Sequence, residues 1–145
     1  MVLKLIPDSH PLLHRKIEKC NVNLNRPLMH KILKENLEHY EGVGLAANQI
    51  GINERVFVMV SNLETQETIT CFNPKIIKES KETIEYDEGC LSYPDTFREV
   101  TRPKSIEVSY EDVKQNLHKI ELTGFICRIF QHEYDHMEGI VFIER

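Results

Sequence analysis

The chain has 145 residues, 41% of them apolar, and its 18 basic and 23 acidic residues give a formal net charge of -5 at pH 7. This length and apolar content suffice for one globular domain with a buried core, so we expect residues 1–145 to form a single domain. No basic stripe with interleaved aromatic residues is present, which argues against direct nucleic-acid binding, and the longest unbroken apolar run, Val56 to Val60, is far shorter than the roughly 20 residues that cross a bilayer.

The N-terminal residues lack the charged start, apolar stretch and small-residue cleavage site of a secretory signal, which predicts a cytoplasmic protein. The four cysteines are spread along the chain without a C-x-x-C pair. They are Cys20, Cys71, Cys90 and Cys127. This spacing favours free thiols in a reducing compartment, and at least one of these thiols is a candidate metal ligand.

The first predicted helix follows Asn25 and Pro27, a pair that is typical of a helix start, and it ends at Gly42. Apolar residues recur between these limits with the spacing of one helix face. We expect that face to pack on a sheet.

Alternating or β-branched apolar segments predict strands along the middle of the chain. The segments are residues 55–60, 68–72, 76–86, 106–110 and 118–122. The Asn73-Pro74 pair predicts a turn between the second and third segments. The polar connection between the last two predicts an antiparallel hairpin.

A second helix is predicted between Thr123, a favourable N-cap, and Gly139, which stands where a left-handed residue ends a helix. Its apolar residues predict a buried central helix, and the run 140–143 after it predicts a short strand that returns to the sheet. The order of elements gives an α+β fold, with mostly antiparallel strands around this central helix.

The second helix carries the run from Gln131 to His136, in which His132 and His136 are four residues apart and Glu133 follows the first. Helical spacing places both imidazoles on one face, one turn apart, with the carboxylate leaning over the same spot. This is the H-E-x-x-H pattern of a hydrolytic metal site. The alternative is that both imidazoles are ordinary surface groups on an amphipathic helix.

Two protein ligands rarely hold a catalytic metal, because such sites usually supply three and leave one position for water. The best third candidate is Cys90, in the run from Glu88 to Ser92, where Gly89 lets the backbone turn closely before the thiol. The alternative is that Cys90 is a small buried apolar residue, which is common for a free cysteine.

The segment from Gly42 to Gly51 is rich in glycine and follows a predicted helix end. Its bare main chain could pair with an extended peptide in the way an added strand would. Gln49 adds an uncharged amide donor beside small alanines. Taken alone, the segment could equally be a simple turn with a solvated glutamine.

Together these segments closely resemble the peptide deformylase family, whose signatures have the form G-x-G-L-A-A-x-Q, E-G-C-L-S and Q-H-E-x-D-H. This chain matches all three completely and in order, at Gly42 to Gln49, Glu88 to Ser92 and Gln131 to His136. The flanking segments are similar too, so the resemblance covers essentially the whole chain.

The resemblance implies a hydrolase that removes the formyl group from the N-terminal formyl-methionine of new polypeptides and releases formate. The metal ligands that it implies are Cys90, His132 and His136, with water in the fourth position. The metal would polarise the formyl carbonyl and lower the pKa of that water. Glu133 would be the general base that later protonates the leaving amine. The oxyanion would meet the metal, the Gln49 amide and the Leu91 main-chain N–H, and losing one such donor should cost on the order of a hundredfold in turnover.

Substrate contacts follow from the same resemblance. The main chain at Val43, Gly44 and Gly89 would pair with the nascent peptide. The residues implied for the methionine side-chain pocket are Val43, Phe125, Arg128 and Ile129. Arg98 is expected to meet a peptide carbonyl or carboxylate.

Three further residues are expected to support the site rather than touch the substrate. Arg102 would pair with Glu88 to fix the second motif. Asp135 and Gln131 would orient the ligand imidazoles or the motif backbone.

Ligand types do not identify the metal, because two imidazoles and a thiolate suit iron, zinc, nickel or cobalt. The resemblance implies Fe²⁺ as the first choice for the bound metal and Zn²⁺ as the second. It implies N-formylmethionyl peptides as substrates, met as ribosome-proximal nascent chains. We also expect a monomer. Relative to longer family members the chain is a short form without a C-terminal helix, which is compatible with a bacterial or a bacteriophage origin.

Two other functions use the same residues. A zinc peptidase also carries H-E-x-x-H, but a further His or Glu ligand would be expected downstream, and only nine residues follow His136. A non-catalytic module could use Cys90, His132 and His136 as a structural clamp, but such sites normally close with a fourth protein ligand.

Overall fold

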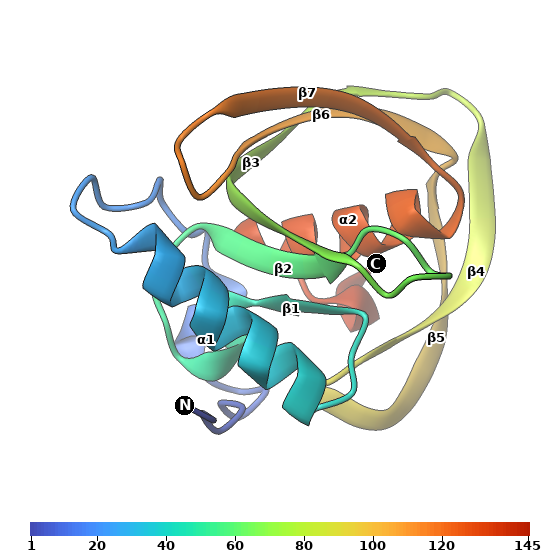
Figure 1. The fold of residues 1–145 in the computed structure, drawn as a ribbon. Coiled ribbons are helices and arrows are strands. Elements are labelled where there is room, and N and C mark those ends of the chain that lie inside the picture. Colours follow the sequence, from blue (N-terminus) through green and yellow to red (C-terminus); the bar gives the residue numbers. More distant parts are fainter.

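The computed structural model describes residues 1–145 and contains two α-helices and seven strands (Figure 1). The helices are α1, Arg26–His39, and α2, Gly124–Met137. The strands are β1, Gly44–Ala46; β2, Val56–Val60; β3, Thr68–Glu79; β4, Thr83–Cys90; β5, Tyr93–Pro103; β6, Ser105–Glu111; and β7, Leu117–Thr123. β1, β2, β3, β6 and β7 form one sheet in that order, while β4 and β5 form a separate two-stranded sheet. Every pairing is antiparallel, which confirms the predicted α+β fold.

Helix α1 begins as its sequence predicts, because the Asn25 side chain accepts a hydrogen bond from the main-chain N–H of Leu28 at 3.1 Å. Its buried residues Leu33 and Leu37 pack against apolar side chains of β1 and β2. The prediction that this helix packs on a sheet is confirmed.

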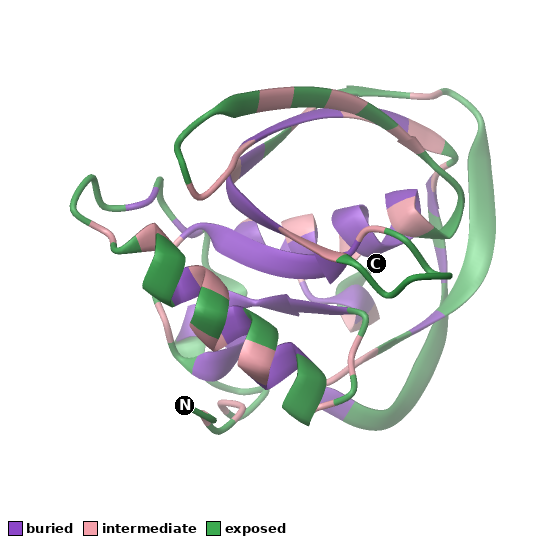
Figure 2. Cartoon of the chain, in the orientation of Figure 1, coloured by how far each residue is buried: buried purple, intermediate pink, exposed green.

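Strand β2 is buried at all five positions because a helix covers each face of it. Val56 and Val58 pack in the cluster that includes α1, whereas Phe57 packs in the cluster that includes α2. The rings of Phe57 and Phe130 meet edge to face, with their centroids 5.1 Å apart. Figure 1 shows α1 and α2 on opposite sides of β1 and β2, and Figure 2 shows β2 buried along its length.

Helix α2 is the more deeply buried of the two, and residues 132–136 lie within it. Its apolar side packs on β1, β2, β6 and β7, and its N-terminal half reaches the β4–β5 hairpin through Arg128. Neither α2 nor α1 is long and apolar enough to cross a membrane.

The prediction of two strands around an Asn73-Pro74 turn is wrong. β3 runs without a break from Thr68 to Glu79, and the register against β6 shifts between Phe72 and Lys75. Asn73 takes a φ of 49° at this shift, a left-handed value that asparagine tolerates. Proline is accommodated in a strand at such a bulge, where it need not donate a ladder hydrogen bond.

The prediction of a final strand over residues 140–143 is also wrong. The chain forms a 3-10 helix at Phe142–Glu144 instead. Val141 and Phe142 are buried against Tyr93 and Val100 of β5. The apolar run therefore covers the β4–β5 hairpin rather than extending the main sheet.

Helix α2 ends close to an N-terminal segment of the chain. The main-chain N–H of Ile17 donates to the carbonyl of Met137 at 2.7 Å. Gly139 follows with a φ of +75°, and a Cβ built there would lie 2.5 Å from the carbonyl carbon of Arg15. Glycine is therefore required at position 139 both by the backbone conformation and by the neighbouring main chain.

We expect Gly139→Ala to lower the free energy of unfolding by about 3 kcal/mol or more, because a left-handed alanine and a backbone clash add together. Gly124→Ala is the matched control, because Gly124 has a φ of +67° but no atom within 4 Å of a Cβ built on it. That control should lose only about 1–2 kcal/mol. Urea unfolding of both variants measures the difference, and equal losses would contradict the role of the Arg15 contact.

Candidate active site

Three potential metal ligands from two elements converge beside α2. Cys90 ends β4, and His132 and His136 lie one turn apart on α2. Their ligand atoms all lie within 4.8 Å of one another. Cys90 Sγ and His136 Nε2 are 3.5 Å apart, and the two imidazole centroids are 5.3 Å apart.

This arrangement fits a tetrahedral transition metal. Bonds of about 2.3 Å to sulfur and about 2.0 Å to nitrogen place those two ligand atoms about 3.5 Å apart at a tetrahedral angle. His132 Nδ1 bonds to Glu88 Oε1 at 2.9 Å, which leaves Nε2 as the free ligand nitrogen. Cys90, His132 and His136 could therefore hold one metal ion and leave a fourth position open.

The two histidines differ in their protonation. Burial holds the pKa of His136 well below its ordinary value, so its imidazole is neutral, the form that binds metals. Burial also acts to lower the pKa of His132, but hydrogen bonds to Cys90 and Glu88 outweigh it and raise that pKa to about 10. A metal bound at His132 would therefore displace a proton.

Glu133 is buried beside the three ligands, and its Oε1 has no hydrogen-bond partner. Burial raises the pKa of this carboxyl to about 7, although the charge of His132 acts to lower it. Gly44 leaves room for it, because a Cβ at that position would lie 2.5 Å from Glu133 Oε2. Glu133 is thus a carboxyl that can take up and release a proton near neutral pH.

Gln49 connects the Gly42–Gln49 motif to the Glu88–Ser92 motif. Its Oε1 accepts from the main-chain N–H of Ala46 at 3.0 Å, which fixes the direction of the amide. Its Nε2 donates to Ser92 Oγ at 3.0 Å and lies 3.4 Å from Cys90 Sγ. The amide donor is therefore held next to the thiol of the ligand cluster.

Glu88 is a buried carboxylate with three partners. Arg102 Nη2 donates to Glu88 Oε1 at 2.8 Å, and Arg128 Nη1 donates to Oε2. His132 Nδ1 is the third partner. Burial alone would raise the pKa of Glu88, but the bonds from Arg102 and His132 dominate and lower it to about 2.

The predicted Arg102–Glu88 pair is present, whereas the bond from Glu88 to His132 was not predicted. Asp135 accepts from Arg102 Nη1 at 2.8 Å and from Arg145, so it acts on the histidine only through Arg102 and Glu88. Gln131 donates to the carbonyl of Pro103 at 3.1 Å, and its side chain forms no hydrogen bond with either imidazole.

A cavity of about 510 Å³ opens beside the ligand cluster, and we call it the site cavity. Most of the predicted site residues line it. They are Val43, Gly44, Gln49, Gly89, Cys90, Leu91, Phe125, Arg128, Ile129, His132 and Glu133. His136 is buried behind it, and Arg98 lies outside it with its guanidinium on the carbonyl of Ile143.

Several cavity residues were missed by sequence reasoning, among them Asp87, Asp95 and Phe97. They belong to the β4–β5 hairpin on either side of the second motif. The pairing of β4 with β5 brings these residues to the cavity. In the sequence, the only signal for them is that they lie within a few residues of Cys90.

Comparisons with known proteins agree on one family. The family model described as polypeptide deformylase matches residues 2–145. The peptide deformylase of Thermotoga maritima is 40% identical over 139 residues, which are 93% of this chain and 81% of that protein. Its crystal structure has a TM-score of 0.90 at 38% identity and covers 100% of this chain and 97% of that chain. A probable peptide deformylase from Synechococcus phage S-SSM7 has a TM-score of 0.89 at 38% identity, with 98% of each chain covered.

These matches span the three motifs, the hairpin and the helix that bring the ligand atoms together, and they leave the zinc-peptidase and structural-clamp alternatives without support. The chain belongs to the polypeptide deformylase family, metal-dependent hydrolases that remove the formyl group from the N-terminus of nascent polypeptides.

Proposed function

We propose that residues 1–145 act as one catalytic domain in which Cys90, His132 and His136 hold a divalent metal against the central helix α2. Glu133, Gln49 and the main-chain N–H of Leu91 then carry the hydrolysis. The observation that supports this most directly is the convergence of three ligand atoms within 4.8 Å, beside a buried carboxylate that has no partner for Oε1.

The types of ligand do not determine which metal the site binds. One thiolate and two imidazoles accept Fe²⁺, Zn²⁺, Ni²⁺ or Co²⁺, and we assign Fe²⁺ first and Zn²⁺ second. When bound, such an ion supplies Lewis-acid chemistry that makes water a nucleophile near neutral pH and polarises a carbonyl.

Glu133 moves the proton in this scheme. Its carboxylate accepts a proton from the attacking water as the new C–O bond forms at the formyl carbon. It returns the proton to the amide nitrogen as the C–N bond breaks, which yields formic acid and a free amine. Burial, which raises the pKa of this carboxyl, makes it a better proton acceptor than an exposed glutamate.

Gln49 and Leu91 stabilise the charge that develops on the formyl oxygen. The Gln49 N–H that faces Cys90 is the one we assign to this oxygen, since the other donates to Ser92. Because Ala46 fixes the amide from the opposite side, the donor is in place before reaction.

The substrate peptide would lie between β1 and β4. β1 is an edge strand of the main sheet and pairs only with β2, so its other edge is available to an added strand. We assign the main chain of Val43, Gly44 and Gly89 to this pairing. The methionine side chain would enter the part of the cavity lined by Val43, Phe125, Arg128 and Ile129.

We assign Arg98 to a peptide carbonyl or carboxylate, which requires its guanidinium to leave the carbonyl of Ile143 when the peptide binds. For the protein as a whole we propose a cytoplasmic monomer that acts on nascent chains near the ribosome. Its four cysteines are all free, which is consistent with a reducing compartment.

The purified protein should release formate from a formyl-methionyl tripeptide and should leave the peptide bonds of the unformylated tripeptide intact. Formate dehydrogenase coupling measures the first reaction, and mass spectrometry of the peptide measures the second. Peptide cleavage without formate would show that the site is a peptidase.

Glu133→Gln should lower kcat by about 10²–10⁴-fold, because the amide keeps the shape of the side chain but cannot carry the proton. Metal content, measured by mass spectrometry of the digested protein, should stay at the wild-type level. A variant that kept full turnover would refute the assignment of the base.

Cys90→Ala should lose bound metal, because two imidazoles alone hold a transition metal weakly. Cys20→Ala is the matched control, since Cys20 donates to the carbonyl of Arg55 and lies outside the site cavity. Metal content of both variants after dialysis gives the result. Equal retention in the two would mean that Cys90 is not a ligand.

A further inference from the structure

A line of side-chain hydrogen bonds leads from His132 to another face of α2. His132 Nδ1 donates to Glu88 Oε1 at 2.9 Å, and Arg102 Nη2 donates to the same oxygen at 2.8 Å. Arg102 Nη1 donates to Asp135 Oδ2 at 2.8 Å. Arg145 completes the line, because its Nε and Nη2 donate to the two oxygens of Asp135 at 2.9 and 2.6 Å.

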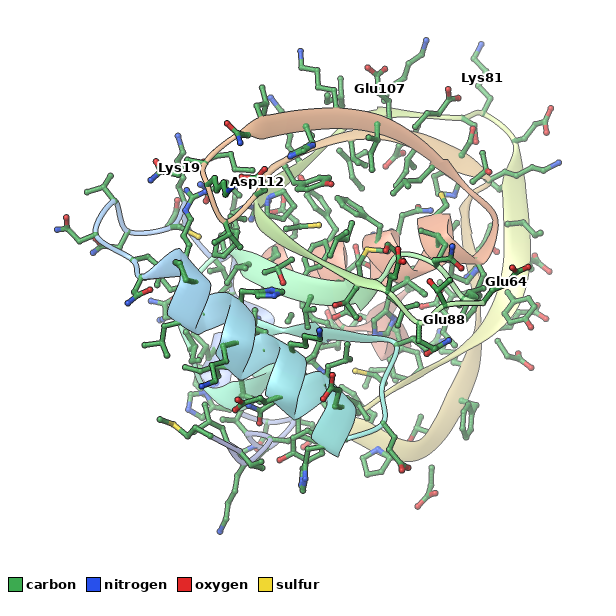
Figure 3. All side chains as sticks on the ribbon, viewed as in Figure 1. Lys19, Glu64, Lys81, Glu88, Glu107 and Asp112 are labelled. Carbon is green, nitrogen blue, oxygen red and sulfur yellow. The ribbon has the colours of Figure 1, made fainter.

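The inner members of this line are shielded from water. Glu88, Arg102 and Asp135 are all buried. Figure 3 shows Glu88 within the outline of the molecule, whereas Lys81 and Glu107 project from its surface. Because a buried charged group cannot replace a lost partner with water, a change at one member must be taken up by its neighbours.

Arg102 is shared between two carboxylates. Its Nε and Nη2 form a two-point contact with Glu88, at 2.5 and 2.8 Å, whereas Asp135 receives only Nη1. A carboxylate binds an arginine best through both oxygens, so Asp135 alone would compete for a second N–H of this guanidinium. Arg145 removes that competition, because it occupies both oxygens of Asp135. The oxygen that Glu88 offers to His132 therefore depends on Arg145.

The segment that carries Arg145 is itself held against the site. Phe142 is buried, and the centroid of its ring lies 5.8 Å from that of the His132 imidazole and 5.8 Å from that of the Tyr93 ring. The main-chain N–H of Arg145 donates to the carbonyl of Phe142 at 3.2 Å. The guanidinium thus comes from a turn that packs on the ligand imidazole.

We propose that Arg145 is a positioning residue for the metal site. By holding both oxygens of Asp135, it keeps Arg102 on Glu88. Glu88 then holds the imidazole of His132 with Nε2 directed at the metal. This inference rests on the proposed function, because it takes His132 as a metal ligand. Arg145 acts from a distance, since it does not line the site cavity.

The charge of Arg145 by itself would have the opposite effect. Removing a positive charge near a cation site favours binding of the cation, so a loss of metal affinity on removing Arg145 identifies a positional effect. Lys78 provides the matched control. It lines the same second cavity as Arg145, of about 510 Å³, but donates no hydrogen bond to Asp135.

The test measures the dissociation constant for Zn²⁺ by competition with a chelator. Loss of a partner behind a metal ligand costs about 10–100-fold, and Arg145 acts at the far end of the line, so Arg145→Met should weaken binding by about tenfold. Lys78→Met should change the constant by less than about twofold. Arg145→Lys keeps the charge but not the two parallel N–H bonds, so its affinity should lie between those of the wild type and Arg145→Met.

A second measurement follows the imidazole directly. In the Zn²⁺-loaded protein with ¹⁵N-labelled histidine, NMR detects the Nδ1–H proton of His132 that bonds to Glu88. Its resonance should shift in Arg145→Met and stay in place in Lys78→Met. At saturating Zn²⁺, kcat of Arg145→Met should fall while KM for a formyl-methionyl tripeptide changes by less than about twofold, because the residues that line the site cavity are unaltered.

A double-mutant cycle tests whether Arg145 acts through Asp135. In the Asp135→Asn background, Arg145→Met should change the Zn²⁺ dissociation constant by less than about twofold, because the carboxylate that Arg145 holds is absent. A full tenfold effect in that background would mean that Arg145 acts by another route.

Four outcomes would overturn the inference. They are wild-type Zn²⁺ affinity or an unmoved His132 resonance in Arg145→Met, wild-type affinity in Arg145→Lys, an equal loss in Lys78→Met, and additive losses in the double-mutant cycle. Failure of the proposed function is a distinct result, because the wild-type protein itself would then fail to bind Zn²⁺ or to release formate.

Discussion

The site depends on the burial of one carboxylate, Glu88. A buried charge is costly unless it is paired and hydrogen-bonded, and Glu88 satisfies this requirement with donors from two elements. Arg102 comes from β5, whereas Arg128 and His132 come from α2. Since Glu88 itself lies on β4, its bonds tie the hairpin to the helix, and a movement of the hairpin away from α2 would separate its charge from Arg128 and His132.

This tie matters because the ligand atoms belong to separate parts of the fold. His132 and His136 are fixed by α2, which packs on the main sheet, but Cys90 is at the end of a strand that pairs only with β5. The main-sheet hydrogen bonds therefore do not position the thiol. Its place is set by Glu88, two residues earlier in the chain, and by Gln49, whose Nε2 reaches Cys90 and Ser92 from the first motif.

Sequence patterns correctly predicted the features that depend on interactions between residues close together in the chain. The N-cap of α1, the burial of β2 and the one-turn spacing of His132 and His136 all follow from residues within a few positions of each other, whereas α1 ends at His39 and not at the predicted Gly42. The predictions failed where contacts between residues far apart in the sequence determine the local structure. Residues 141–142 pack on β5 rather than forming a strand, and the bond between Glu88 and His132 joins residues 44 positions apart.

Two glutamates show how the same side chain is given opposite properties within one cavity. Glu88 and Glu133 are 6% and 4% exposed, and burial acts against the charged form of both. The pKa of Glu88 is nevertheless about 2, whereas that of Glu133 is about 7. Their partners account for the difference, because two arginines and a histidine bond to Glu88 while Glu133 Oε1 has none. One carboxyl is thereby a permanent anion that orients the His132 imidazole, and the other is left able to exchange a proton, which is the division of roles that the proposed hydrolysis requires.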